Sequence, residues 1–198
     1  MTPVATQVVR SAKVVAGGAS GGGGKGKGAC LAFVRRICGE FQVGSGHDSV
    51  VLPQLRVESA RPGQITASMV ISRTNLNRLG SLHGGCIASL TDTIGSLAIA
   101  SKGFYSTGVS TDINTTYVKS GGTEGDTVLL QGDLISIGKT LAFTRIQLLH
   151  PVSNAVLAYG SHTKFIGKCH GHPENVTFDP TGDVIVQGKQ PHEWENVD

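Results

Sequence analysis

The sequence predicts an α+β fold in which an antiparallel sheet wraps around one long central helix. Two observations carry this expectation. Apolar residues recur at three- and four-residue steps from Ile87 to Ala98, which is the signature of one buried helical stripe. Four β-type segments separated by turn residues follow this stripe, and two more precede it. With 198 residues, the chain is long enough for one domain with a sizeable core.

The chain before the central helix divides into a leader, a short helix and two strands. Residues 1–28 predict a flexible, basic leader, since this glycine-rich stretch has too little apolar surface to pack. Helical spacing of apolar residues predicts a short amphipathic helix over 29–41. Residues 50–59 and 64–71 are expected to be strands, joined by the turn ARPG.

The chain after the central helix, which is expected to stop at Gly103, predicts four strands. Their ranges are 109–118, 127–137, 140–149 and 155–166. An antiparallel meander has to wrap the helix in order to bury it, and this arrangement is the hotdog fold. We therefore assign residues 29–167 to one domain. Residues 168–198 form a polar C-terminal extension, in which 176–186 favour a small hairpin.

Charge and composition exclude several classes of protein. The first 39 residues carry six basic side chains and no acid, whereas the remainder is net negative. No folded basic face with interleaved aromatics is visible, so nucleic acid is not an expected partner. No apolar run is long enough to span a membrane. The acid-free leader resembles a mitochondrial transit segment, with a plain flexible tail in a cytoplasmic protein as the alternative.

The four cysteines form no paired motif. Their positions are Cys30, Cys38, Cys86 and Cys169. A reduced, intracellular compartment is the simpler inference from this pattern.

The segment from Asn77 to Asp92 carries the residues expected to do chemistry. Hydrolysis of an acyl group needs hydrogen-bond donors for the carbonyl oxygen and a base for water. Gly84 and Gly85 fall where the long helix begins, and a helix start offers free N–H groups without a side chain in the way. Asp92 lies in the apolar stripe, where a carboxylate is costly without partners or a task. Taken alone, each feature also fits an ordinary turn or a solvated aspartate.

Spacing along the helix adds a geometric condition. Gly84 and Asp92 are separated by about 12 Å of helix at roughly 1.5 Å per residue. One carbonyl group cannot reach both residues of the same chain. If both belong to one site, two chains have to supply them, and an isologous dimer makes two equivalent sites of this kind.

A wider set of motifs resembles the PaaI-like branch of the hotdog-fold thioesterases, and within it the acyl-CoA thioesterase 13 type. The resemblance spans 29–167 and rests on spacing and order along the chain. The residues that carry it are Asn77, His83-Gly84-Gly85, Asp92, Gly108-Val109-Ser110, Lys139-Thr140-Leu141-Ala142-Phe143 and Gly160-Ser161-His162-Thr163-Lys164.

The resemblance implies hydrolysis of acyl-CoA thioesters in fatty acid metabolism. Asn77 and Gly84 match the residues that polarise the thioester carbonyl. Asp92 matches the acid that activates water, and Ser110 matches the residue that helps to place it. His83 matches a supporting histidine beside the oxyanion site, with a plain helix-start residue as the alternative.

Binding of CoA and assembly also follow from the resemblance. The segment after the strand tyrosine contacts the nucleotide in the family, and here it comprises Tyr117, Val118, Lys119, Ser120, Gly121 and Gly122. It lacks the usual proline, so its contacts depart from the family pattern. Lys119 suits a phosphate by charge, and Lys139 and Lys164 are weaker candidates. The implied assembly is a dimer of dimers, a homotetramer, and neither a metal nor a cofactor is expected.

Two rival functions remain on the residues alone. A hotdog hydratase or dehydratase would pair an acid with a histidine, and His83 and Asp92 are both present. A non-catalytic acyl-CoA-binding module would use the same pocket but has no need for Asp92. The acyl preference should depend on how four apolar residues pack around the substrate tunnel: Ile87, Leu90, Ile94 and Phe143.

Overall fold

A computed structural model of the chain describes residues 28–194. The helices are α1 (Ala29–Gln42), α2 (His47–Val51) and α3 (Gly84–Ala100). The strands of the main sheet are β1 (Leu55–Arg61), β2 (Gln64–Val70), β3 (Val109–Tyr117), β4 (Thr127–Ile137), β5 (Leu141–Leu149) and β6 (Val156–Phe165). Short 3-10 turns cover Arg73–Asn75 and Pro191–Glu193, and β7 (Thr177–Phe178) and β8 (Ile185–Gln187) make a separate hairpin.

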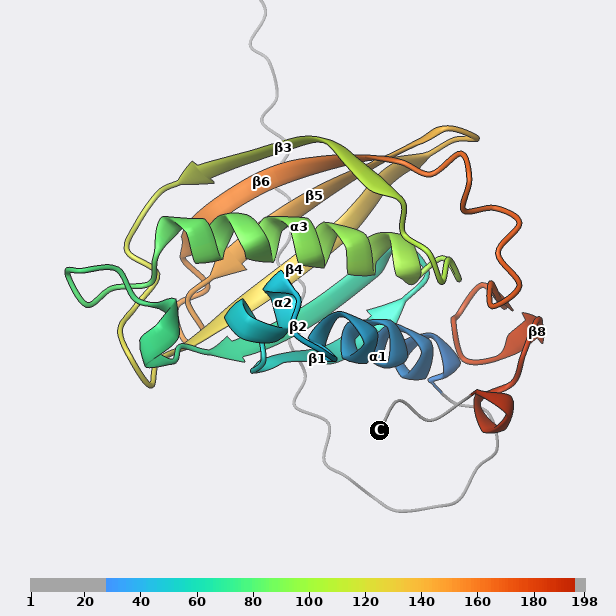
Figure 1. Cartoon of the computed structure of the whole chain (residues 1–198), viewed down its shortest axis with the longest axis horizontal. Helices are drawn as coiled ribbons and strands as arrows, with labels where there is room; N and C mark the ends of the chain where they lie inside the picture. Colours follow the sequence, from blue (N-terminus) through green and yellow to red (C-terminus); the bar gives the residue numbers. More distant parts are fainter. Residues whose placement is uncertain (1–27, 195–198) are drawn as a thin grey trace, which may run out of the picture.

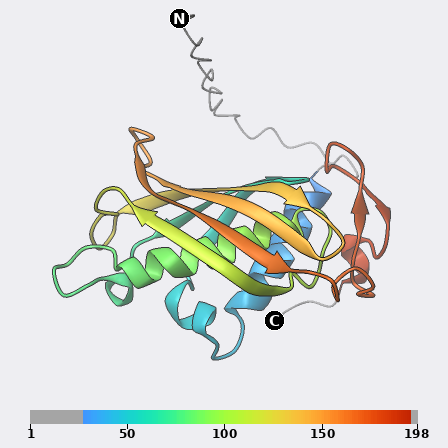
Figure 2. The ribbon, with the colours of Figure 1, turned by 90° about the horizontal axis from the view of Figure 1, so that it is seen from above.

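The six main strands form one antiparallel sheet in the order β1-β2-β4-β5-β6-β3. The sheet curves around α3, and all three helices lie on the same face of it (Figures 1 and 2). This arrangement confirms the hotdog fold predicted from the sequence.

Helix α3 is the centre of the core because most of its residues are buried. Leu90, Ile94 and Leu97 are at most 1% exposed. The helix contacts five of the six sheet strands, and α1 covers the remaining strand, β1. Each large aliphatic side chain buried in this way contributes about 1.5–3 kcal/mol to folding.

Two sequence predictions need correction. The strand predicted over 50–59 is wrong at its start, because α2 occupies His47–Val51 and β1 begins only at Leu55. Short β-branched runs do not distinguish a strand from a buried helical turn. The four later strands are not a simple meander either. β3 lies at the sheet edge beside β6, while β4 pairs with β2.

The C-terminal extension packs on the domain, and its predicted hairpin is confirmed as β7 and β8. Asp183 caps the start of α1, since its carboxylate accepts from the Gly28 N–H at 3.1 Å. The Arg36 guanidinium lies 4.8 Å from the Tyr105 ring centroid and 5.4 Å from that of Trp194. Such cation–π contacts are each worth about 0.5–2 kcal/mol.

The predicted leader lies outside the described residues apart from Gly28. Within 28–194, no helix is long and apolar enough to cross a membrane. In the same range, no three His, Cys, Asp or Glu side chains group in a way that would hold a metal ion, and this includes Cys169, His170 and His172.

Candidate active site

The start of α3 presents a free backbone donor. His83 is the N-cap residue, and its Nδ1 accepts from the Gly85 N–H at 2.8 Å. The Tyr117 hydroxyl at the end of β3 donates to the Gly84 carbonyl at 3.0 Å. The hydrogen bonds of the described residues leave the Gly84 N–H without an acceptor. We call Asn77, His83, Gly84 and Tyr117 the helix-start group.

Asn77 is held by its own loop. Its Oδ1 accepts from the N–H groups of Leu79 at 2.9 Å and Ser81 at 3.2 Å. Its Nδ2 donates to Ser81 Oγ at 2.8 Å. An amide nitrogen carries two hydrogens, so one remains for another acceptor. The loop therefore fixes which hydrogen of Asn77 is free.

The segment assigned to CoA runs beside the start of α3. The N–H groups of Val118 and Lys119 both donate to the Leu157 carbonyl, at 2.9 and 3.0 Å. Gly122 accepts from the Leu82 N–H at 2.9 Å. A Cβ atom at Gly121 would come within 2.7 Å of Leu82. Close packing explains why glycines occupy this turn, and the Lys119 residue is exposed.

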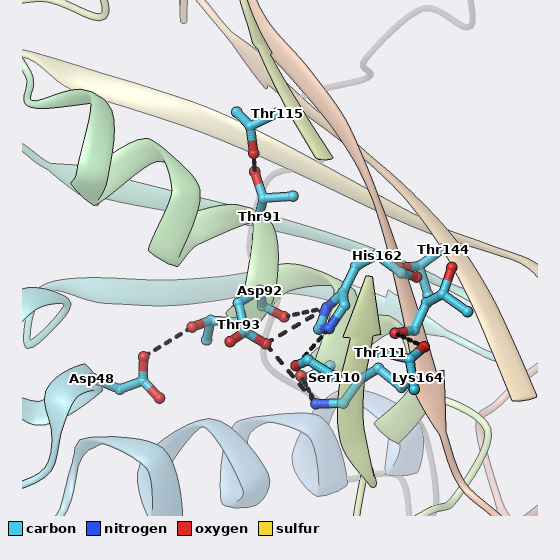
Figure 3. Close-up of polar contacts among 12 residues, drawn as sticks. Asp48, Thr91, Asp92, Thr93, Ser110, Thr111, Thr115, Thr144, His162 and Lys164 are labelled. Carbon is cyan, nitrogen blue, oxygen red and sulfur yellow. Dashed lines mark hydrogen bonds and ion pairs between the residues drawn. The ribbon is translucent and has the colours of Figure 1, made fainter. Parts of the chain in front are cut away.

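A second cluster lies at the middle of α3 (Figure 3). His162 of β6 is completely buried, and its Nδ1 lies 3.1 Å from the Asp92 carbonyl oxygen and 3.5 Å from Asp92 Oδ1. Its Nε2 lies 2.9 Å from Ser110 Oγ. Lys164 Nζ is 3.9 Å from Asp92 Oδ1 and donates to Ser96 Oγ at 2.6 Å. We call Asp92, Ser110, His162 and Lys164 the helix-middle group.

A β-bulge directs Ser110 into this group. The register of β3 against β6 shifts between Ser110 and Asp112, where Thr111 is the extra residue. Regular alternation would place Ser110 and Ile113 on opposite faces of the strand. The bulge puts Ser110 opposite Lys164 and Ile113 opposite His162, two residues that point towards α3. Bulges of this kind commonly re-aim a side chain next to a site.

Burial lowers the pKa of both basic residues in the helix-middle group. Burial lowers the pKa of His162, and the neighbouring Lys164 lowers it further, while Asp92 acts in the opposite direction. The ring is therefore neutral at neutral pH. Burial also lowers the pKa of Lys164, against the attraction of Asp92. The Asp92 side chain is 45% exposed, so one side of the carboxylate remains open to solvent.

Two sequence expectations change at this site. Lys164, a weak candidate for CoA phosphate, is buried beside Asp92 and cannot reach a surface phosphate. Phe143 is 43% exposed on the outer face of β5, away from Ile87 and Leu90. It does not line the small pocket between α3 and the sheet to which Ile87 and Leu90 contribute.

The structure unites some predicted residues and keeps others apart. Asp92 and Ser110 meet through His162, whereas Gly84 lies eight residues earlier on the same helix. The helix-start group can polarise a carbonyl oxygen, and the helix-middle group can activate water. His162 was not among the predicted catalytic residues. Its signal was a histidine at an inward position of an alternating apolar strand, which also fits an ordinary core histidine.

Known proteins share this fold and much of this sequence. Residues 79–152 match the family model described as the thioesterase superfamily. A Schizosaccharomyces pombe protein that is named as an esterase is 44% identical over 145 residues, covering 73% of this chain and 89% of that protein. Acyl-coenzyme A thioesterase 13 of Homo sapiens is 35% identical over 117 residues, covering 59% of this chain and 83% of the relative.

Among solved structures, zebra fish thioesterase superfamily member 2 superposes with a TM-score of 0.63 at 34% identity. The match covers 68% of this chain and 96% of that structure.

Proposed function

Because this chain belongs to the thioesterase superfamily and is a thioester hydrolase, we propose that it cleaves acyl-CoA thioesters to a free acid and CoA. The observation that carries the proposal is the helix-middle group. A half-exposed carboxylate stands beside a buried neutral histidine and a strand serine. The name of the human relative supports acyl-CoA as the substrate class.

The carbonyl oxygen of the thioester binds at the helix-start group. The Gly84 N–H points out of the start of α3, where the helix dipole favours negative charge. The free hydrogen of Asn77 supplies a second donor. Donors placed where negative charge develops are each worth about 10²–10³ in rate. This arrangement favours the tetrahedral oxyanion over the neutral carbonyl.

Asp92 acts as the base. Water adds to the carbonyl carbon while one of its protons passes to the Asp92 carboxylate, and Ser110 holds the other hydrogen. The resulting oxyanion collapses, the carbon–sulfur bond breaks, and the CoA thiolate leaves with the electron pair. The proton on Asp92 passes to the thiolate, which restores the carboxylate. None of these steps needs a protein thiol. Burial raises the pKa of nearby Cys86 to about 11, so this thiol is protonated at neutral pH.

Two chains share each site. About 12 Å of helix separates the two groups within one chain, so the Gly84 end of one α3 has to face Asp92 of another. The outer edge of β3 supports this pairing, because most of its residues are exposed and no strand lies beyond it within 28–194. Edge strands with unpaired backbone groups readily pair with another chain. An isologous pairing of two β3 strands makes two sites per dimer.

Two such dimers associate as a tetramer in this proposal. Phe143 and Tyr159 are 43% and 48% exposed on the outer face of the sheet, on the adjacent strands β5 and β6. Apolar groups on this helix-free face provide a surface for a second dimer. The CoA moiety lies along the segment 117–122, with Lys119 at its phosphates.

The base is tested by Asp92→Asn. We expect kcat/KM for a medium- or long-chain acyl-CoA to fall by about 10²–10⁴, because the amide cannot accept the proton. Released thiol is followed with a colour reagent. Asp133→Asn is the matched control, since this partly exposed acid lies on β4, outside the helix-middle group, and accepts a hydrogen bond from Gln64 Nε2 at 3.0 Å. Full turnover in Asp92→Asn would contradict the assignment.

The shared site is tested by mixing two inactive variants. Asn77→Ala chains and Asp92→Asn chains, each inactive alone, should form dimers in which one of the two sites is intact. A random mixture should then recover about a quarter of the wild-type activity, as two-fold symmetry requires. If verified heterodimers show no recovery, the two groups do not act across the interface.

A further inference from the structure

We propose that His162 is a positioning residue whose Nδ1–H tautomer makes Ser110 an acceptor of a water hydrogen. The inference rests on the proposed hydrolysis and adds to it the residue that controls the direction of the hydrogen bond between His162 and Ser110. It follows from the order of contacts Asp92–His162–Ser110, which crosses from α3 through β6 to β3 (Figure 3).

The tautomer follows from what each ring nitrogen faces. Nδ1 faces two acceptors, the carbonyl oxygen of Asp92 at 3.1 Å and its Oδ1 at 3.5 Å. A lone pair at Nδ1 would be repelled by both, so the hydrogen resides there. Nε2 is then the acceptor, and within 28–194 its hydrogen-bond partner is Ser110 Oγ at 2.9 Å. The serine hydroxyl therefore donates to the ring.

The direction of this bond decides what Ser110 offers to water. A hydroxyl has one hydrogen and two lone pairs. With its hydrogen committed to His162, Ser110 can only accept, so it takes one hydrogen of the attacking water. Asp92 takes the other, and a lone pair of the water oxygen is left for the carbonyl carbon. If Ser110 pointed its hydrogen at the water instead, it would occupy one of the two lone pairs of the water oxygen, which makes that oxygen less nucleophilic and leaves its second hydrogen unheld.

The surroundings keep the ring neutral and in place. Burial lowers the pKa of His162 most, and Lys164 on β6 lowers it further by repelling a second proton, while Asp92 on α3 and Asp112 on β3 favour protonation. A protonated ring would donate from Nε2 and reverse the bond to Ser110. Thr144 Oγ1 on β5 donates to the His162 carbonyl at 3.0 Å and fixes the backbone behind the ring.

The tautomer is measured directly by two-bond ¹H–¹⁵N correlation spectra of the protein labelled at histidine nitrogen. We expect a pyridine-like Nε2 and a protonated Nδ1 for His162, assigned with the His162→Gln variant. The neutral signature should persist below pH 6.5, the ordinary pKa of histidine. A protonated Nε2 at neutral pH would overturn the inference, and this outcome does not depend on whether the protein hydrolyses any thioester.

The action through Ser110 is measured by a double-mutant cycle on kcat/KM. His162→Phe and Ser110→Ala should each lower kcat/KM by about tenfold, as expected for one lost hydrogen bond. If His162 acts through Ser110, the double variant should also lose about tenfold, whereas independent effects would multiply to about a hundredfold. Multiplied losses would refute the positioning role.

The His162→Gln variant distinguishes a lost hydrogen bond from a folding defect in His162→Phe. Its amide can donate to the Asp92 carbonyl and accept from Ser110, so it should retain more activity than His162→Phe at an equal melting temperature. Equal losses in two folded variants would count against the inference. Failure of Asp92→Asn to reduce turnover would instead count against the proposed function.

Discussion

Replacing Gly95 by alanine should push His162 away from Asp92 and Ser110. Gly95 lies in the buried part of α3, where an added Cβ atom would stand 2.7 Å from Thr144 Oγ1 and 2.9 Å from His162 Nδ1. Ordinary van der Waals contact for a Cβ atom begins at 3.4 Å, so both side chains have to retreat. Neither has free space, because Thr144 and His162 are at most 3% exposed.

The size of the effect follows from opposing terms. Helix propensity alone favours alanine over glycine by about 1 kcal/mol. Overpacking a buried site costs about 1–3 kcal/mol, and a buried hydrogen bond that is stretched or lost costs about 1–3 kcal/mol more. We therefore expect Gly95→Ala to destabilise the fold by about 1–5 kcal/mol. The melting temperature falls by about 2–4 °C for each kcal/mol in a chain of this length.

Thermal denaturation and thioester turnover measure the two consequences. Gly39→Ala in α1 is the matched control, because a Cβ atom there meets nothing within 4 Å. The control should raise stability by up to about 1 kcal/mol and keep full activity. Gly95→Ala should lose stability and about tenfold in kcat/KM through the displaced His162. If both variants are equally stable and equally active, the close approach of β6 to α3 at Gly95 affects neither folding nor turnover.

Two further predictions concern the helix-start group and the C-terminal extension. Tyr117→Phe removes the 3.0 Å hydrogen bond to the Gly84 carbonyl. We expect kcat/KM to fall by about two- to tenfold with little change in stability. An unchanged kcat/KM would show that this hydrogen bond does not position Gly84. The hydrogen bond from Lys189 lowers the pKa of Glu174 below its usual 4.5. A depressed carboxyl pKa contributes stability that is complete above pH 4.5 and is lost as pH falls through the folded-state pKa. The extension should therefore loosen in acid, reported by fluorescence of Trp194, and an acid titration without a change in this signal would contradict the reasoning.

Much of the architecture was accessible from residue patterns. The 3.6-residue period of α3 and the turn residues between the later strands predicted the central helix and four strand ranges to within a residue or two. The order of β3 in the sheet was not accessible, since pairing is decided by contacts between residues far apart in the chain. The segment 47–51 was misassigned, because five β-branched and polar residues have no period that separates a helical turn from a strand.

The sequence by itself predicted which residues of α3 would carry the chemistry, and it determined that Gly84 and Asp92 lie too far apart for one carbonyl. That distance is a property of any helix, so it needed no coordinates. Only the tertiary structure decided that Ser110 turns inwards, since the bulge at Thr111 arises from pairing with β6. The same holds for His162, which reaches Asp92 because Gly95 has no side chain to keep the two elements apart. The contacts that complete the site join residues up to 70 positions apart in the chain, and only packing brings them together.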